Sequence, residues 1–294
     1  MRKISFSLWL FLFPLVVLCQ TLNLKVMTFN IRYNNPNDGP FAWQVRMPMV
    51  INVIQQENPD ILCCQEVLYD QVNDLQHVLP GYQWTGVGRD DGNRSGEFVP
   101  IFYNMDRFNM KAKGTFWLSE TPNSPGTKSW DAACNRIVTW VKIKDMRFKK
   151  NIFIFNTHFD HQSKLARSES ASLLLSAIRQ IAGDDWVIVC GDFNDTEGSE
   201  MYNILTGGAM NLTLINTTRI SRQEPSGPDY TFIGFPFKPE KGNTIDFIFT
   251  RNNKSATVLE HRVITYNVDG RYPSDHLPVI VNFELKLKKR RNVF

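Results

Sequence analysis

The chain has 294 residues, of which 43% are hydrophobic and 12% aromatic, a composition that excludes a disordered or collagen-like protein and permits a large core. The formal net charge of +4 is concentrated at the two ends, in Arg2, Lys3 and five basic residues between positions 286 and 291. The body between them carries a formal charge of about −3, which argues against the basic stripe of a general duplex-DNA binder without excluding a nuclease.

The first 19 residues have the pattern of an export signal. Arg2 and Lys3 precede an apolar stretch over residues 4–18 that is too short to favour a membrane-spanning helix. The small side chain of Cys19 is compatible with cleavage before Gln20, and cleaved export to the periplasm or the medium is the preferred interpretation. Lipid attachment at Cys19 is the alternative, and Leu18 fits that signal poorly. We expect one domain over residues 20–285 and a basic tail over 286–294.

Hydrophobic periodicity and turn residues define the expected elements in chain order. Helices are predicted at 43–56, 69–78 and 165–181, and strands at 22–30, 61–64, 82–87, 99–103, 137–142, 152–157, 186–190, 245–249 and 277–287. Strands outnumber helices, and several consecutive strands have no helix between them. The pattern therefore favours two mixed sheets packed together with helices outside, rather than a simple parallel α/β fold.

The cysteines do not have the spacing of a zinc site or of a disulfide framework. Cys63 and Cys64 are adjacent in a predicted strand, so their side chains are expected on opposite faces and not to pair. Both, with Cys190, lie in apolar runs, where a cysteine usually behaves as a small buried hydrophobe.

Polar residues follow apolar runs at the ends of several predicted strands. They are Asn30, Glu66, His158, Asp192, Asn194, Asp246, Asp275 and His276. Each one alone has an ordinary explanation, such as a turn, a helix cap or an ion pair. Several carboxylates at the edge of a core are costly unless they share a cation or a task, so the set as a whole predicts a catalytic site.

The order and spacing of these motifs resemble a known family. Gln65-Glu66, Asn156-Thr157-His158, Gly191-Asp192-Phe193-Asn194, Ile245-Asp246 and Ser274-Asp275-His276 are similar to the motifs of the endonuclease/exonuclease/phosphatase superfamily, the deoxyribonuclease I-like fold. The resemblance covers nearly all of the chain after the export signal. It implies a four-layered α/β/β/α sandwich, in which two packed mixed β-sheets are flanked by helices and the active site lies on one rim.

The resemblance also implies roles for the strand-end residues. Glu66 resembles the main Mg²⁺ ligand, with Asn30 and Asp275 near the same ion, and Mn²⁺ is the alternative metal. Asp192 resembles the base that activates water, and Asn194 a residue that positions water or phosphate. His276 resembles the histidine that contacts the scissile phosphoryl group, oriented by Asp246, and His158 a second histidine that donates to phosphate or leaving group. The expected reaction is in-line attack of water on phosphorus.

Other polar residues near these motifs are candidates of lower rank. Arg136 and Arg167 are candidate phosphate contacts, although an exposed arginine is more often only solvated. Glu97 is a candidate orienting partner for His158. Asp160 and His161 either join the site or shape its loop, and His77 and His261 are expected at the surface.

We expect a metal-dependent hydrolase of phosphoric esters that acts as a monomer. The substrate, a sugar phosphate, a nucleotide or nucleic acid, or a lipid head group, is left open. Loops over residues 89–94, 117–130 and 230–237 are expected to wall the site and to select it. Gly191-Asp192-Phe193-Asn194-Asp195 also fits a calcineurin-like phosphoesterase, but that class needs Asp-x-His and Gly-Asn-His motifs that the sequence lacks. The remaining alternatives are a nuclease for single-stranded or fragmented nucleic acid, and a non-catalytic binding module of the same fold.

Overall fold

The computed structural model describes residues 21–251 and 253–286. The predicted export signal and all but the first residue of the predicted basic tail lie outside these ranges. The helices are α1 (Trp43–Glu57), α2 (Tyr69–Val78), α3 (Lys164–Ala182) and α4 (Glu200–Thr206), with short 3₁₀ turns η1 (Pro36–Phe41), η2 (Ala209–Asn211) and η3 (Thr217–Ile220). The strands are β1 (Thr21–Asn30), β2 (Ile61–Gln65), β3 (Tyr82–Thr85), β4 (Ile101–Asn104), β5 (Phe108–Trp117), β6 (Ile137–Asp145), β7 (Lys150–His158), β8 (Trp186–Asp192), β9 (Leu214–Asn216), β10 (Asp246–Arg251), β11 (Ala256–Val263) and β12 (Val279–Lys286).

The strands form two mixed sheets of six strands each. The first has the order β11-β12-β1-β2-β4-β3, and the second has the order β5-β6-β7-β8-β10-β9. In the first sheet β1 runs parallel to β2, and in the second β7 runs parallel to β8, whereas their other neighbours are antiparallel. Both sheets therefore combine parallel and antiparallel pairing, as the run of consecutive strands in the sequence predicts.

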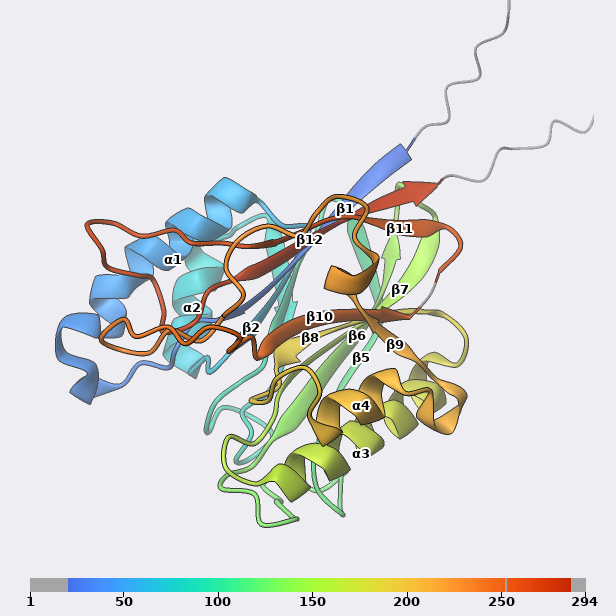
Figure 1. Ribbon diagram of the computed structural model, residues 1–294, viewed down its shortest axis with the longest axis horizontal. Helices are drawn as coiled ribbons and strands as arrows, with labels where there is room; N and C mark the ends of the chain where they lie inside the picture. The colour runs from blue at the N-terminus through green and yellow to red at the C-terminus, as the bar shows by residue number, and fades with distance from the viewer. Residues whose placement is uncertain (1–20, 252, 287–294) are drawn as a thin grey trace, which may run out of the picture.

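Three apolar layers hold the sheets and helices together. The layer between the sheets contains Val26, Cys63, Ile154 and Cys190 among its buried residues. A second layer lies between α3 and the second sheet, and a third between α1 and α2 and the first sheet. Figure 1 shows α1 and α2 beside one sheet and α3 and α4 beside the other. The predicted four-layered sandwich is confirmed, and burial of the apolar faces of both sheets is the main force that stabilises it.

The differences from the expected elements are concentrated at sheet edges and short elements. β5, β9, β11 and α4 are not predicted by the sequence patterns. β5 is an edge strand whose residues from Asn109 to Thr115 are exposed or only partly buried, with Lys111 and Lys113 among them, and charged side chains are typical of edges that must not pair further. Its one neighbour in the sheet is β6, with which it pairs along its length.

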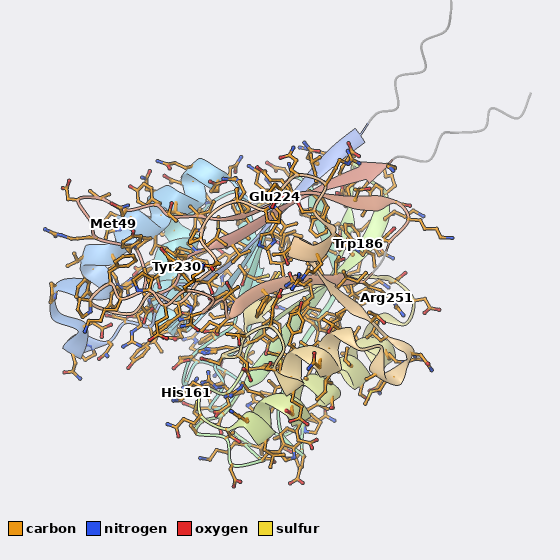
Figure 2. The ribbon with its side chains drawn as sticks, viewed as in Figure 1. Met49, His161, Trp186, Glu224, Tyr230 and Arg251 are labelled. Atoms are coloured by element: carbon orange, nitrogen blue, oxygen red, sulfur yellow. The ribbon has the colours of Figure 1, made fainter. Side chains whose placement is uncertain are left out.

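The polar strand ends all lie at one end of the sandwich. β1, β2, β7 and β8 finish there, and β10 begins there, because it runs antiparallel to β8. Figure 2 shows Trp186, at the start of β8, and Arg251, at the end of β10, toward the other end from His161, which follows β7. Within the described part of the chain, no helix combines the length and apolarity needed to cross a membrane.

Candidate active site

Strand register brings three of the predicted residues side by side. In the second sheet, His158 on β7 lies opposite Asp192 on β8, and Asp192 lies opposite Asp246 on β10. The first sheet contributes Asn30 at the end of β1 and Glu66 directly after β2. Both sheets therefore deliver polar side chains to the same rim, and a hydrogen bond from Asn30 to Asp192 connects the two sheets there.

Asp192 is at the centre of this group. Its Oδ2 accepts a hydrogen bond of 2.9 Å from Asn30 Nδ2, and its Oδ1 accepts one of 2.9 Å from the backbone N–H of Asn194. The same Oδ2 lies 3.5 Å from His158 Nε2 and 3.7 Å from His276 Nε2. Two imidazoles therefore face one carboxylate oxygen, an arrangement that suits the handling of a proton.

Asn30 also contacts Glu66, through a hydrogen bond of 3.0 Å from Nδ2 to Oε1. Its Oδ1 accepts from the backbone N–H of Arg32 at 3.0 Å. The predicted metal ligand thus presents its amide nitrogen, not its oxygen, to the carboxylates. In this structure Asn30 holds Glu66 and Asp192 together as a hydrogen-bond donor.

The electrostatic environment separates the two histidines. Burial lowers the pKa of His158 well below its ordinary value, and the cationic Arg136 and Arg89 act in the same direction. Burial also opposes the charge of His276, but the carboxylates of Asp246 and Asp192 raise its pKa well above the ordinary value. His158 is therefore neutral and His276 cationic near neutral pH.

Burial also raises the pKa values of two carboxyl groups in the site, those of Asp192 and Asp275. Burial and the neighbouring Asp246 raise the pKa of Asp192 to about 7, against the pull of His276. Burial likewise raises the pKa of Asp275, and His276 opposes the shift. A carboxyl group with a pKa near the working pH can accept a proton from water and release it again, so Asp192 has the properties of a general base.

His276 is held by a hydrogen bond of 2.9 Å between its Nδ1 and Asp246 Oδ2. This bond places Nδ1–H on Asp246 and leaves Nε2 directed at Asp192. Phe232 packs edge-on against the His276 ring at a centroid distance of 5.0 Å. The predicted orienting role of Asp246 agrees with this geometry.

Backbone strain accompanies the site. Arg32, Glu66 and Asn194 have φ angles of 59°, 58° and 51°, in the left-handed region that non-glycine residues rarely adopt. All three line the cleft. Strained backbone persists where the surrounding structure imposes it, and it is concentrated at functional sites.

The side chains surround a cleft of about 470 Å³, a volume that suits a small ligand. Its lining consists of Arg32, Tyr33, Glu66, Arg89, Glu97, Cys134, Arg136, His158, His161, Asp192, Asn194, Phe232, Ile245, Asp275 and His276. Asn30 and Asp246 are not in the lining, and each contacts residues that are. Of the three loops expected to wall the site, 89–94 and 230–237 contribute to the cleft, through Arg89 and Phe232, and 117–130 does not.

Two of the lower-ranked candidates, Arg167 and Glu97, have their hydrogen bonds with other partners than predicted. Arg167 is not in the cleft lining: its Nε donates to Asp195 Oδ2 at 2.9 Å, and its Nη1 donates to the Asp160 carbonyl. Glu97 lies 3.9 Å from His158 Nδ1, beyond hydrogen-bond distance, and accepts instead from Arg89 Nη1 at 2.7 Å. Arg167 braces the loop after β7, and Glu97 is primarily the partner of an arginine.

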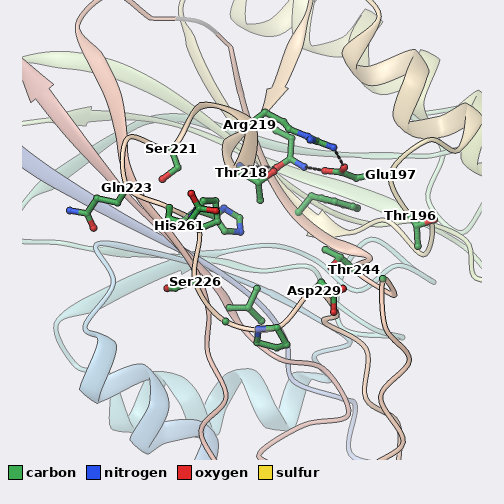
Figure 3. A pocket seen from close by; sticks show the side chains of 18 of the residues that line it. Thr196, Glu197, Thr218, Arg219, Ser221, Gln223, Ser226, Asp229, Thr244 and His261 are labelled. Carbon is green, nitrogen blue, oxygen red and sulfur yellow. Dashed lines mark hydrogen bonds and ion pairs between the residues drawn. The ribbon is translucent and has the colours of Figure 1, made fainter.

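His261 is buried and not at the surface as the sequence analysis expects, whereas His77 is exposed. Burial lowers the pKa of His261 to about 4, and its Nδ1 lies 3.0 Å from Thr217 Oγ1. It lines a separate cavity of about 780 Å³ beside residues 221–229, which Figure 3 shows with Arg219 and Glu197 at its border. This larger cavity shares no lining residue with the cleft and contains none of the predicted catalytic residues.

The cleft also contains residues outside the predicted set of site residues. Arg32 lies within 4 Å of carboxylate oxygens of Glu66 and Asp275, and Tyr33 donates its backbone N–H to Glu66 at 3.4 Å. Arg32 and Tyr33 directly follow the Asn30 motif. Their closeness to that motif is the one sequence signal that identifies them.

The acidic part of the cleft fits a metal ion. Glu66, Asp192 and His276 each offer a ligand atom, and these three atoms lie within 4.8 Å of one another. Burial, and then the charge of Asp246, raise the pKa of Asp192, while burial, and then the charge of Glu66, raise the pKa of Asp275. A bound cation would favour the charged form of both acids. Asp275 Oδ2 lies on the Arg32 side of this group, 3.9 Å from Nε.

The two-sheet sandwich carries a buried cluster of acids and histidines at one rim, the kind of residue set that metal-assisted hydrolysis uses. Residues 27–276 match the sequence model of the endonuclease/exonuclease/phosphatase family. The chain therefore belongs to the endonuclease/exonuclease/phosphatase family, and the family resemblance inferred from the motifs is confirmed.

Known proteins are similar over most of the chain. An endonuclease/exonuclease/phosphatase from Bacteroides vulgatus is 38% identical, with a TM-score of 0.84 over 90% of this chain and 100% of that one. The mannosyl-6-phosphatase Bt3783 of Bacteroides thetaiotaomicron is 34% identical, with a TM-score of 0.81 over 88% of this chain and 99% of that one. Nocturnin of Drosophila melanogaster is 23% identical over 90% of this chain and 47% of its own length, so the chain spans about half of that relative.

Proposed function

We propose that the protein is a Mg²⁺-dependent phosphomonoesterase whose substrate is a small sugar phosphate. The observation that carries this proposal is the position of Asp192 between His158, His276 and Asn30 in a cleft of about 470 Å³. The size of the cleft favours a small ester over a nucleic-acid strand. The likeness to a mannosyl-6-phosphatase at 34% identity supports a sugar phosphate as the first substrate to test.

Glu66 would hold the ion, with Asp192 in the same group of possible ligand atoms and Asp275 in the lining of the same cleft. The oxygens of these three acids are the ligands that Mg²⁺ prefers. When bound, the ion would stabilise negative charge that develops on the phosphoryl oxygens. Mn²⁺ has the same preference for oxygen ligands and is the alternative metal.

The protein's own residues supply the proton chemistry. Asp192 Oδ2 takes a proton from the attacking water, and Asn194 beside it positions that water or a phosphoryl oxygen. His276, kept cationic by Asp246, places positive charge against the phosphoryl group. Neutral His158 offers Nε2–H to a phosphoryl oxygen or to the leaving oxygen. Water attacks phosphorus in line with the leaving oxygen as the bond between phosphorus and that oxygen breaks. The leaving oxygen takes up a proton from solvent and departs as the alcohol, so no covalent intermediate is needed.

A substrate panel with Mg²⁺ tests this function. We expect hydrolysis of mannose 6-phosphate and glucose 6-phosphate, and rates at least about tenfold lower for a nucleoside monophosphate, a simple phosphodiester and single-stranded RNA. A chelator should abolish turnover, and re-addition of Mg²⁺ should restore it and raise Tm, because a ligand that binds the folded state stabilises it. Faster hydrolysis of the diester or of RNA would move the protein to the nuclease alternative, and chelator-resistant turnover would exclude the metal.

Export of the chain is a further proposal, supported by the basic start and the apolar stretch over residues 4–18. Expression of the full-length chain in a bacterium, followed by N-terminal sequencing of the protein from the periplasm or medium, should give a mature chain that begins at Gln20. A lipid-modified Cys19 at the new N-terminus would establish the anchored alternative, and an unprocessed Met1 in the cytoplasm would contradict export.

A further inference from the structure

Arg136 is a buried cation whose hydrogen-bonding groups are incompletely used. Only 4% of the surface of Arg136 is exposed to solvent. Nη2 donates to His161 Nδ1 at 3.0 Å, whereas Nε and Nη1 have no hydrogen-bond partner among the described residues. A buried guanidinium with unpaired N–H groups is costly, so such a group in a ligand cleft indicates a partner that arrives with the ligand.

The acids near Arg136 are already engaged. Asp160 Oδ1 accepts backbone N–H groups of Gln162 and Ser163, and its Oδ2 accepts that of Ala133, while Arg136 Nε lies 3.7 Å from Oδ2. The pKa of His161 is lowered by burial and next by the charge of Arg136. The positive field of Arg136 is therefore only partly compensated by its neighbours.

Arg89 adds a second guanidinium to the same region. Its Nη1 donates to Glu97 Oε2, whereas its buried Nε has no hydrogen-bond partner among the described residues and lies 4.0 Å from Asp90 Oδ1. Arg89, Arg136 and His158 line both the cleft and a small recess that opens beside it. We call this part of the cleft, defined by Arg89, Arg136 and His158, the arginine recess.

The recess is preformed by two loops. Trp117 Nε1 donates to the Arg89 carbonyl at 2.6 Å, and Asn135 Nδ2 donates to Asp90 Oδ1 at 2.9 Å, which connects the loop that carries Arg89 to the loop that carries Arg136. Gly96, with φ of +79°, lies against Asp90, and a Cβ there would clash with the Asp90 carboxylate. A recess that is rigid before binding loses little entropy when an anion enters.

The recess adjoins the acidic part of the cleft through His158, but its two arginines are paired elsewhere. The hydrogen bonds and ion pairs of Arg89 and Arg136 go to Glu97, Asp90, Asp160 and His161. Within the described part of the chain, neither guanidinium has a hydrogen bond or ion pair with Glu66, Asp192 or Asp275. An anion held by Arg89 and Arg136 would therefore lie beside the phosphate that Asp192 and His276 face, with His158 between the two groups.

From this geometry we infer that the arginine recess is a subsite for a second anionic group of the substrate, a phosphate or a carboxylate. The inference rests on the proposed function and narrows it, because the substrate then carries one anionic group at the acidic part of the cleft and another at the recess. Guanidinium groups suit this task, since they bind phosphate and carboxylate oxygens through paired N–H donors.

Matched substrates test the recess. The measured quantity is kcat/KM, with Mg²⁺, for glucose 6-phosphate, glucose 1,6-bisphosphate and 6-phosphogluconate. The wild type should favour at least one of the two doubly anionic compounds over glucose 6-phosphate by about tenfold or more, and Arg136→Met should lower that ratio by about 10- to 100-fold, the range for a lost charged hydrogen bond. Arg136→Lys should lower it less. Arg219→Met, which removes an exposed arginine at the other cavity, should leave the ratio unchanged.

Preference for glucose 1,6-bisphosphate would indicate that the recess binds a second phosphate, and preference for 6-phosphogluconate would indicate a carboxylate. A wild-type ratio near one for both doubly anionic compounds would overturn the inference. So would an equal loss in Arg136→Met for single and double anions, because the arginine would then serve the scissile phosphate.

Calorimetry on the Asp192→Asn variant separates the subsite from catalysis. We expect this variant to bind glucose 1,6-bisphosphate or 6-phosphogluconate more tightly than glucose 6-phosphate, and Arg89→Met to reduce the difference. This result would support the recess whether or not the wild type hydrolyses the compounds. Failure of the wild type to hydrolyse any of the three would reject the proposed function. Equal binding of all three compounds would reject the recess and leave the proposed function to the turnover assay. Arg89→Met serves as the second variant should Arg136→Met fail to fold.

Discussion

Replacing Asp192 by asparagine is expected to lower kcat by about 10³- to 10⁴-fold, the upper range for removal of a general base. The amide keeps the shape of the side chain and the acceptor oxygen for the Asn194 N–H, but it cannot take a proton from water. Steady-state kinetics on a sugar phosphate with Mg²⁺ measure the loss. Asp229→Asn is the matched control, because Asp229 is exposed and lines the other cavity. Retention of more than about a tenth of wild-type kcat in Asp192→Asn would contradict its assignment as the base.

The same variant should also weaken the dependence of the free energy of unfolding on pH. Burial and Asp246 raise the pKa of Asp192 to about 7 in the folded chain, above the ordinary value of about 3.9 for an unfolded chain. Between these values the folded state retains a proton that the unfolded state releases, so the free energy of unfolding falls as pH rises. Without metal, Asp192→Asn should show a shallower fall than the wild type. Urea denaturation in a chelator at about pH 5 and about pH 8 measures this difference.

An identical pH slope in the two proteins would show that Asp192 does not carry the buried charge that its surroundings indicate. His276 contributes to the slope with the same sign, since its raised pKa stabilises the folded state at low pH and this stabilisation is lost as pH rises. For this reason the expected result is a shallower slope and not a flat one.

The strand-end chemistry was predictable because it interrupts strong apolar patterns. Asp192 follows six residues of a fully buried strand, and His158 follows a similar run. A polar residue at such a break is costly, and several breaks together indicate a shared site. The hydrophobic pattern thus predicts both the strands and the rim where their ends meet.

Side chains whose partners come from distant loops were not predictable in the same way. Arg89 meets Glu97 across a tight loop, and Arg167 meets Asp195 from the loop after β8. The sequence pattern around an arginine in a polar stretch does not indicate whether its side chain lines a cleft or stabilises a loop through an ion pair. His261 lies on β11, where Glu260 and Arg262 suggest exposure, yet the 3₁₀ turn η3 covers it through Thr217. Tertiary packing decides burial at such edge positions.

Replacing Asp246 by asparagine should move both limbs of the pH–rate profile to lower pH. On the alkaline side, the loss of the Asp246 charge removes a main support of the His276 cation, so His276 loses its proton at lower pH. On the acid side, Asp246 contributes to the raised pKa of Asp192, so Asp192 ionises at lower pH without it. We also expect kcat at neutral pH to fall by about 10²- to 10³-fold, because His276 loses charge and orientation.

The measurement is kcat/KM for a sugar phosphate across the pH range in which the folded protein is stable, with Mg²⁺ held constant. Thr217→Val is a matched control in the fold, since it removes the buried hydroxyl that contacts the other buried histidine, His261, and leaves the cleft unchanged. That control should keep the wild-type profile. An Asp246→Asn protein that is folded but titrates like the wild type would show that the Asp246–His276 hydrogen bond does not set the charge of His276. If only the alkaline limb moved to lower pH, Asp246 would affect the titration of His276 but not that of Asp192.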